Sequence, residues 1–215
     1  MIYCTAFTIV ALVLFMGNTI FGLSPGVGVY LKMLTSTGFL AMAIAAGGLH
    51  SGYGQMILVA LFFSWWGDLF LISGSEKIFL AGLIVFFIGH LGFAGAFLIH
   101  GVDWKWFGIS AALCLIPLVI ILGWLNSHLG SMRIPVYAYI VIISIMVALA
   151  AGAWGRGATT LVIVGAIIFY VSDIFVARDR FVTPSPWNGY LGLPLYYIAQ
   201  MLLAASILGV NEPQG

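Results

Sequence analysis

Charged side chains are scarce in this sequence. Only 6% of its 215 residues are Asp, Glu, Lys or Arg, while 63% are hydrophobic. A soluble domain carries about a quarter charged residues, so seven basic and six acidic side chains cannot cover a water-facing surface. The formal net charge of +1 also offers no basic patch for nucleic acid and no polybasic arm for anionic lipids. The main solvent of this chain is therefore predicted to be lipid.

Cysteine is nearly absent as well. Cys4 and Cys114 both lie inside apolar stretches, where cysteine usually packs as a small apolar side chain. We therefore expect no disulfide bond between them. The first residues are apolar and lack the basic stretch and small-residue cleavage site of a signal peptide. The start of the sequence thus predicts a first membrane span.

Long apolar stretches fill the rest of the sequence. They are continuous, unlike the alternating strands of a membrane β-barrel, and a spanning helix needs about 20 mostly apolar residues. The sequence predicts an all-α polytopic membrane protein with about eight transmembrane helices in a single bundle domain, residues 1–215. The expected helices are 2–22, 30–47, 55–73, 77–98, 104–125, 134–152, 158–177 and 190–209.

A short segment recurs in the two halves of the chain. Residues 63–71 align with residues 168–176, and Asp68 and Asp173 occupy the same place in the alignment. Four helices per half is an even number, so both halves would run in the same direction through the membrane. This predicts a 4+4 parallel pseudo-repeat about an axis along the membrane normal.

The basic residues are distributed unevenly among the loops. Those in or beside the odd-numbered loops are Lys32, Lys77, Arg133, Arg178 and Arg180, whereas the even-numbered loops hold only Lys105 and Arg156. The positive-inside rule then places the odd-numbered loops in the cytoplasm and both termini outside. The expected location is the cytoplasmic membrane of a bacterium, or the endoplasmic reticulum of a eukaryote.

Two aspartates lie inside predicted spans. A charged side chain in the bilayer core costs several kcal/mol, so such residues usually have a functional role. Asp68 and Asp173 each precede the expected end of their helix by about five residues, and both helices run toward the same membrane face. At about 1.5 Å per residue, both carboxylates lie roughly 7–8 Å inside that face.

Other polar side chains are expected near the same depth. Lys32 lies in the first turn of the segment 30–47, at the level where a long amine can reach lipid head groups. Tyr196 and Gln200 lie one turn apart on one helix face. Ser64 precedes Asp68 by one turn, Tyr170 precedes Asp173 by about one turn, and His90 lies deeper. Together they predict a polar pocket open to one leaflet. Lys32 could instead pair with an aspartate in a purely structural role, and His90 could be a packing residue.

At these residues the sequence resembles the YhhN family of membrane proteins, the lysoplasmalogenases. The matching stretches are residues 64–68, 86–90, 165–173 and 194–200, with Lys32 before them and Phe181 among them. Two positions depart from the family pattern. Met33 follows the lysine, where the family often has proline, and Phe93 stands where the family often has tyrosine. Phe93 lacks the hydroxyl, so no catalytic role can be carried to that position.

The resemblance implies hydrolysis of the vinyl ether bond of lysoplasmalogens to a fatty aldehyde and a glycerophospho-base. Vinyl ethers resist hydroxide but react with acid, and protonation of the outer alkene carbon gives an oxocarbenium ion. That chemistry needs a proton donor and a carboxylate near the developing cation, as in glycosidases. The implied catalytic residues are Asp68 and Asp173, and the implied substrate-binding residues are Lys32, Ser64, His90, Tyr170, Tyr196 and Gln200. No metal or other cofactor is expected, and the expected partners are a lysophospholipid substrate and membrane lipids.

Two other functions also fit the residues. Asp68, His90 and Asp173 could be three ligands of a metal-dependent membrane lipid hydrolase. Paired intramembrane carboxylates with a half-repeat also occur in proton-coupled transporters. The sequence leaves the head group, the chain length, the oligomeric state and the choice of acid between the two aspartates open.

Overall fold

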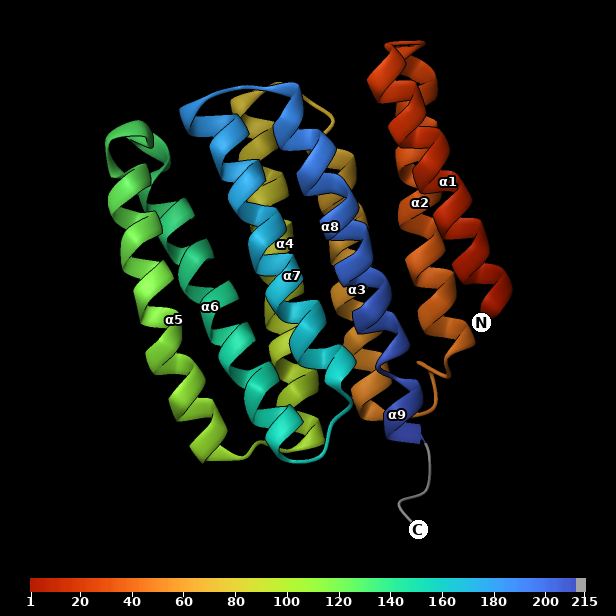
Figure 1. The fold of residues 1–215 in the computed structure, drawn as a ribbon, viewed down its shortest axis with the longest axis vertical. Coiled ribbons are helices and arrows are strands. Elements are labelled where there is room, and N and C mark those ends of the chain that lie inside the picture. The colour runs from red at the N-terminus through yellow and green to blue at the C-terminus, as the bar shows by residue number, and fades with distance from the viewer. Residues whose placement is uncertain (212–215) are drawn as a thin grey trace.

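The computed structural model describes residues 1–211, which form a bundle of eight long helices and several short helical segments (Figure 1). The long helices are α1 Ile2–Phe21, α2 Pro25–Ala45, α3 Gly52–Phe70, α4 Glu76–His100, α5 Trp104–Leu125, α6 Arg133–Gly155, α7 Thr160–Ala177 and α8 Pro186–Ala205. Two short 3₁₀ turns join α5 to α6, a π-helix Arg178–Val182 continues α7, and a short helix α9 spans Leu208–Asn211. The all-α prediction is confirmed.

Seven helical segments of the described chain are long and apolar enough to cross a membrane. They comprise every long helix except α3, whose sequence contains the polar residues Gln55, Ser64 and Asp68. The α3 helix packs along α4. The outer surface is apolar, as lipid requires: α5 exposes Leu113, Ile116, Val119 and Ile120. The chain is therefore an integral multi-pass membrane protein.

The start of α2 differs from its predicted position. The helix begins at Pro25 rather than near residue 30, because Ser24 caps it and its hydroxyl accepts a hydrogen bond from the Val27 amide. Proline suits the first helical position because it lacks an amide proton that would be unpaired there. As a result, Lys32 lies in the interior of α2 and not in its first turn, so that prediction was wrong.

The polar segment after α7 is also more regular than predicted. Arg178–Val182, expected to belong to a loop, forms a π-helix that continues α7, and α8 then begins at Pro186 instead of near residue 190. The Asp179 carboxylate accepts hydrogen bonds from the Ser185 amide and the Asn188 side chain. Single π-helical turns occur often at functional sites. Here the π-helix fixes Asp179 and Arg180 at one end of the bundle.

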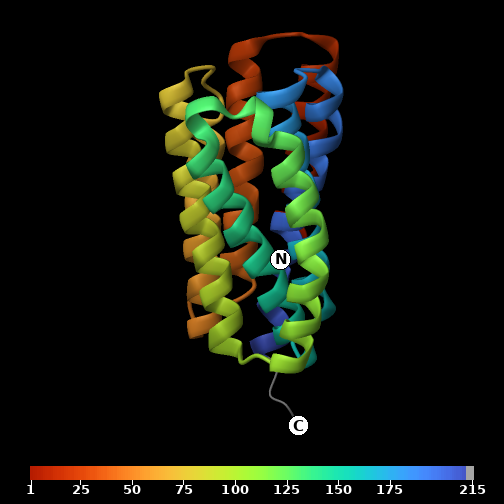
Figure 2. The same ribbon diagram turned by 90° about the vertical axis from the view of Figure 1, so that its left-hand side faces the viewer.

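Helix packing follows the same scheme in both halves of the chain. The hairpins α1–α2 and α3–α4 correspond to α5–α6 and α7–α8, and the contact of α2 with α8 corresponds to that of α6 with α4. All connections after odd-numbered helices lie at the upper end of Figure 1, while α1 begins and α9 ends toward the other end. Figure 2 shows the helices aligned along one long axis. This arrangement agrees with the 4+4 parallel repeat, and it places the ends of α3 and α7 at the same face.

Candidate active site

One cavity of ≈ 460 Å³ lies among α2, α3, α4, α6, α7 and α8 at the end of the bundle where α3 and α7 terminate. Its wall contains five of the eight side chains selected from the sequence: Lys32, Asp68, Tyr170, Asp173 and Tyr196. Much of the remaining wall is apolar and includes Phe79, Leu83, Phe86, Ile140 and Leu193. The α3–α4 connection, the π-helix and the start of α8 also line it, with Ser73, Gly74, Asp179, Arg180 and Asn188. The cavity thus joins one buried and one half-buried carboxylate to a polar end.

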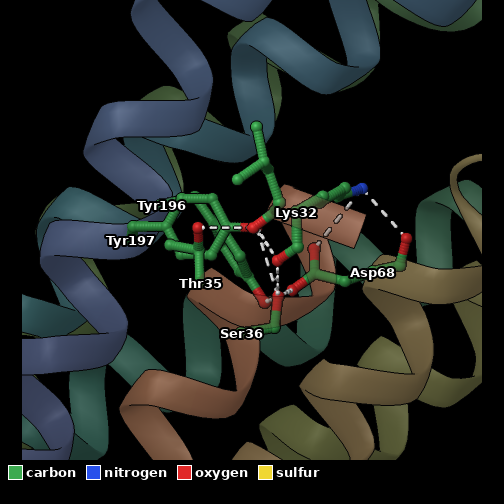
Figure 3. A network of polar contacts seen from close by, with 7 residues as sticks. Lys32, Thr35, Ser36, Asp68, Tyr196 and Tyr197 are labelled. Atoms are coloured by element: carbon green, nitrogen blue, oxygen red, sulfur yellow. Dashed lines mark hydrogen bonds and ion pairs between the residues drawn. The ribbon is translucent and has the colours of Figure 1, made fainter. Parts of the chain in front are cut away.

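Asp68 lies within a dense polar network (Figure 3). Its Oδ2 atom accepts hydrogen bonds from the Ser36 hydroxyl at 2.7 Å and from the Tyr196 hydroxyl at 2.8 Å. The Lys32 ammonium lies 3.6 Å from Oδ1. A further hydroxyl, from Tyr197, lies 3.1 Å from Ser36 Oγ. The Asp68 side chain is only 3% exposed, so these groups replace the water that would otherwise solvate it.

Lys32 is held by the end of a helix as well as by the carboxylate. Its ammonium donates a hydrogen bond of 2.9 Å to the backbone carbonyl of Asp68. The α3 helix ends at Phe70, so this carbonyl belongs to the last turn, whose carbonyls have no partner within the helix. A cation at that position also interacts favourably with the negative end of the helix dipole. The end of α3 therefore fixes the amine beside Asp68.

Lys32 is more enclosed than its expected position implied. We expected the amine at head-group level, but the side chain is only 11% exposed and pairs with Asp68. The ion pair with an aspartate, which the sequence left open, is therefore observed. Lys32 also lines the cavity, so its part in substrate binding stays a prediction.

Asp173 belongs to a second network. The Tyr139 hydroxyl donates a hydrogen bond of 2.7 Å to Asp173 Oδ2 and lies 2.9 Å from His90 Nε2. His90 Nε2 itself is 3.6 Å from the same carboxylate oxygen. The imidazole is fully buried, and its Nδ1 atom lies 3.3 Å from the sulfur of Met146. The Asp173 side chain is 18% exposed, so this carboxylate is the more open of the two.

The two networks correspond under the repeat. Asp68 on α3 matches Asp173 on α7, and the corresponding helices α8 and α4 each place one side chain beside a carboxylate, Tyr196 beside Asp68 and His90 beside Asp173. Residues of α2 contact Asp68, and Tyr139 of α6 contacts Asp173 in the same way. The chemistry differs because only Asp68 is paired with a lysine among the described residues. The repeat thus supplies two carboxylates with unequal surroundings.

Three side chains selected from the sequence do not line the cavity. Ser64 is buried and donates its hydroxyl proton to the Ala60 carbonyl of its own helix. Gln200 is fully buried, and its amide lies beside the Tyr196 hydroxyl without a hydrogen bond of normal geometry. His90 lies behind Tyr139 and Asp173 and is not part of the cavity wall. A substrate-binding role for these three side chains stays a prediction.

Four contributing residues escaped prediction: Ser36, Tyr139, Tyr197 and Arg180. Ser36 follows Lys32 by one turn, a spacing that could have identified it. Arg180 was considered only as a loop charge for topology, although it lies next to the cavity. Nothing local marks Tyr139, because its partners lie on α4 and α7.

The metal-site alternative needs three ligands around one point. Among residues 1–211, no group of three His, Cys, Asp or Glu side chains is spaced to hold a metal ion. His90 and Asp173 are close to each other, but Asp68 belongs to the other network. The three side chains therefore do not form one ligand set.

Sequence comparison identifies the family. The YhhN family model matches residues 27–207, which include both carboxylates and all of α3 to α8. This chain belongs to the YhhN family. It is 32% identical over 166 residues to the lysoplasmalogenase TMEM86A of Bos taurus, covering 73% of this chain and 67% of that protein. The Homo sapiens protein of the same name is 31% identical over 164 residues, with the same coverage. No solved structure matches the chain.

Proposed function

We propose that this member of the YhhN family hydrolyses the vinyl ether bond of lysoplasmalogens within the membrane. The observation that carries the proposal is the pair of carboxylates, Asp68 and Asp173, lining one largely apolar cavity. Two relatives that bear the name lysoplasmalogenase support the substrate class. Both aspartates lie in the region that matches the family.

The reaction can proceed with carboxyl groups alone. A carboxylic acid transfers its proton to the alkene carbon farther from the ether oxygen, and positive charge develops on the ether-bearing carbon and its oxygen. Water adds to that carbon and returns a proton to the carboxylate, which restores the acid. The hemiacetal then breaks its bond to the glycerol oxygen, which takes up the hydroxyl proton. The net change consumes one water and gives a fatty aldehyde and a free glycerol hydroxyl.

The second carboxylate stabilises the cation. A fixed negative charge in a cavity with little water is worth more than the same charge in bulk water. Glycosidases divide their work in a similar way between two carboxyl groups around an oxocarbenium-like transition state. Asp68 and Asp173 take these two roles here.

The shape of the cavity suits a lipid with one chain. Its apolar wall accommodates hydrocarbon, and its polar end lies at the connections between helices. Arg180 is the cation next to the cavity that is not paired with a carboxylate in the described chain: its guanidinium donates to the Gly74 carbonyl and lies 4.6 Å from the centre of the Phe79 ring. Arginine binds phosphate well because its guanidinium offers several donors in one plane. The substrate phosphate therefore binds at Arg180, and Lys32 stays with Asp68.

The product identifies the reaction. Purified protein is incubated with a lysoplasmalogen and, separately, with the acyl lysophospholipid of the same chain length and head group. Free aldehyde from the first substrate, with no fatty acid from the second, is the expected result. Fatty acid without aldehyde would mean that the protein is an esterase and would overturn the proposal.

A further inference from the structure

We infer that Asp173 is the proton donor and that Tyr139 is the residue that positions it. This assignment rests on the proposed vinyl ether hydrolysis. Neither the resemblance between the two halves nor the family match distinguishes the two aspartates. The distinction comes from the hydrogen-bond partners of each carboxyl group.

The hydrogen bonds around Asp173 connect three side chains in a chain. The Tyr139 hydroxyl donates its only proton to Asp173 Oδ2 at 2.7 Å. Its oxygen must then accept the proton carried by His90 Nε2, which lies 2.9 Å away. The chain of donors runs from His90 through Tyr139 to Asp173. His90 therefore carries its proton on Nε2 and fixes the orientation of the Tyr139 hydroxyl.

This chain selects the oxygen that carries the acid proton. Oδ2 of Asp173 already accepts a hydrogen bond, so the proton of the neutral acid resides on Oδ1. No hydrogen bond to Oδ1 is formed within residues 1–211, and Asp173 lines the cavity with an 18% exposed side chain. An unengaged O–H group at a cavity wall is free to approach a substrate carbon. Tyr139 thus orients the Asp173 carboxyl group so that its O–H faces the cavity.

Asp68 has the opposite surroundings. Two hydroxyl protons point at its Oδ2 atom, and the Lys32 ammonium lies 3.6 Å from Oδ1. These donors all favour the carboxylate over the acid, because a carboxylate only accepts hydrogen bonds. The side chain is less exposed than that of Asp173, and burial by itself disfavours a charge, so the ammonium and the two hydroxyl donors are what keep Asp68 ionised. Asp68 remains the anion that stabilises the oxocarbenium ion, while the proton on Asp173 goes to carbon and returns from the attacking water.

Removing single hydroxyl groups tests the role of Tyr139. Tyr139→Phe keeps the ring packed against His90 but removes the donor to Asp173, so kcat should fall at least about tenfold with KM within about twofold of wild type. The solvent deuterium isotope effect on kcat should be at least as large as in wild type, because proton transfer to carbon becomes slower. Tyr137→Phe is the matched control on the same helix, since Tyr137 contacts Asn126 and lies outside the cavity. Unchanged kcat in Tyr139→Phe would overturn the positioning role.

Substitution at His90 separates positioning from packing. His90→Gln keeps an amide donor near the position of Nε2 and should retain most of kcat, whereas His90→Ala should lose about as much as Tyr139→Phe. Thermal unfolding and size-exclusion elution of each purified variant show whether it folds. If His90→Ala folds with wild-type kcat, the chain of donors has no part in turnover.

The residual activity of the aspartate variants tests which one is the acid. Without Asp173, only hydronium ion can protonate carbon, so the rate of Asp173→Asn should rise about tenfold for each unit by which pH is lowered, since carbon protonation is then first order in hydronium. Asp68→Asn keeps the acid and should respond less steeply. The groups facing these carboxylates, Lys32, His90, Tyr139, Tyr170 and Tyr196, are identical in both variants. The reverse pattern would overturn the assignment while leaving the proposed function intact. A wild-type protein that releases no aldehyde would instead overturn the proposed function itself.

Discussion

At the scale of single residues, the proposed reaction depends on the carboxyl groups of Asp68 and Asp173. Asparagine is nearly isosteric with aspartate but can neither transfer the acid proton nor hold the negative charge. Asp68→Asn and Asp173→Asn should therefore each lower kcat/KM by at least about 10², the usual contribution of a general acid. Aldehyde release by purified, folded protein measures the loss. Glu76→Gln is the control, because Glu76 is an exposed carboxylate at the same end of the bundle, outside the cavity.

Lys32 should affect stability as well as activity. Removing one partner of a buried ion pair leaves the other charge without compensation, which costs about 3–5 kcal/mol. Lys32→Met should thus lower the unfolding temperature and kcat, in place of the KM effect expected for a free phosphate-binding amine. Adding Asp68→Asn to Lys32→Met should restore much of the stability but none of the activity. Thermal unfolding in detergent distinguishes these outcomes, and a Lys32→Met protein with a normal melting temperature would contradict the paired role.

The sequence could identify some of these residues and not others, for physical reasons. Asp68 and Asp173 stand out because a charge in an apolar helix is costly wherever it lies. Tyr139 does not stand out, since tyrosine is common in membrane helices and its partners are distant in sequence. The Ser64 hydroxyl bonds to the backbone of its own helix, which helix-face spacing does not reveal, because spacing shows only which side of the helix a residue lies on.

At the scale of structural elements, the π-helix Arg178–Val182 places Arg180 beside the cavity. A hydrogen bond to a charged group contributes about 1.5–3 kcal/mol, so loss of the guanidinium should weaken substrate binding about tenfold or more. Arg180→Gln should raise KM by that factor with kcat nearly unchanged. Lys77→Gln, which removes an exposed cation outside the cavity at the same end, should leave KM as in wild type. If Arg180→Gln lowers kcat and leaves KM unchanged, the substrate phosphate does not bind at Arg180.

Close packing of α3 against α4 holds Asp68 at its depth. A Cβ atom at Gly92 would lie only 3.0–3.2 Å from atoms of Ala60 on α3, whereas one at Gly108 on α5 meets nothing within 4 Å. Gly92→Leu should therefore destabilise the protein by about 1–3 kcal/mol, as overpacking usually does. Gly108→Leu should be neutral, because that side of α5 is exposed. Equal melting temperatures for the two variants would contradict this, because they would mean that α3 and α4 can move apart at position 92 without loss of stability.

Helix existence was easier to predict than helix ends. Each long apolar stretch became a helix, because lipid leaves backbone groups no other partners. The ends depend on local capping, and the Ser24–Pro25 start of α2 was missed because that pair was interpreted as a loop. That difference places Lys32 in the interior of α2 instead of in its first turn.

At the scale of the whole molecule, each half of the chain contains four long helices. Because four is an even number, both halves run in the same direction, and the ends of α3 and α7 lie at one face. The cavity lies at that face, and each half of the chain contributes one carboxylate to its wall. Which compartment that face meets follows from loop charge alone and stays a prediction, as does the choice between a bacterial cytoplasmic membrane and the endoplasmic reticulum. A transporter with the same half-repeat would move a solute without releasing aldehyde, so product chemistry separates the two functions.

The most direct measurement follows the proton in D₂O. If a carboxylic acid protonates carbon, the released fatty aldehyde contains one deuterium on the carbon next to its carbonyl, and turnover is clearly slower than in H₂O. Unlabelled aldehyde kept in the same D₂O buffer with protein controls for later exchange. Catalysis by the two carboxyl groups predicts single deuteration, a normal solvent isotope effect and a rate unaffected by chelators. Aldehyde without deuterium at that carbon, or activity lost to a chelator and restored by zinc, would contradict it.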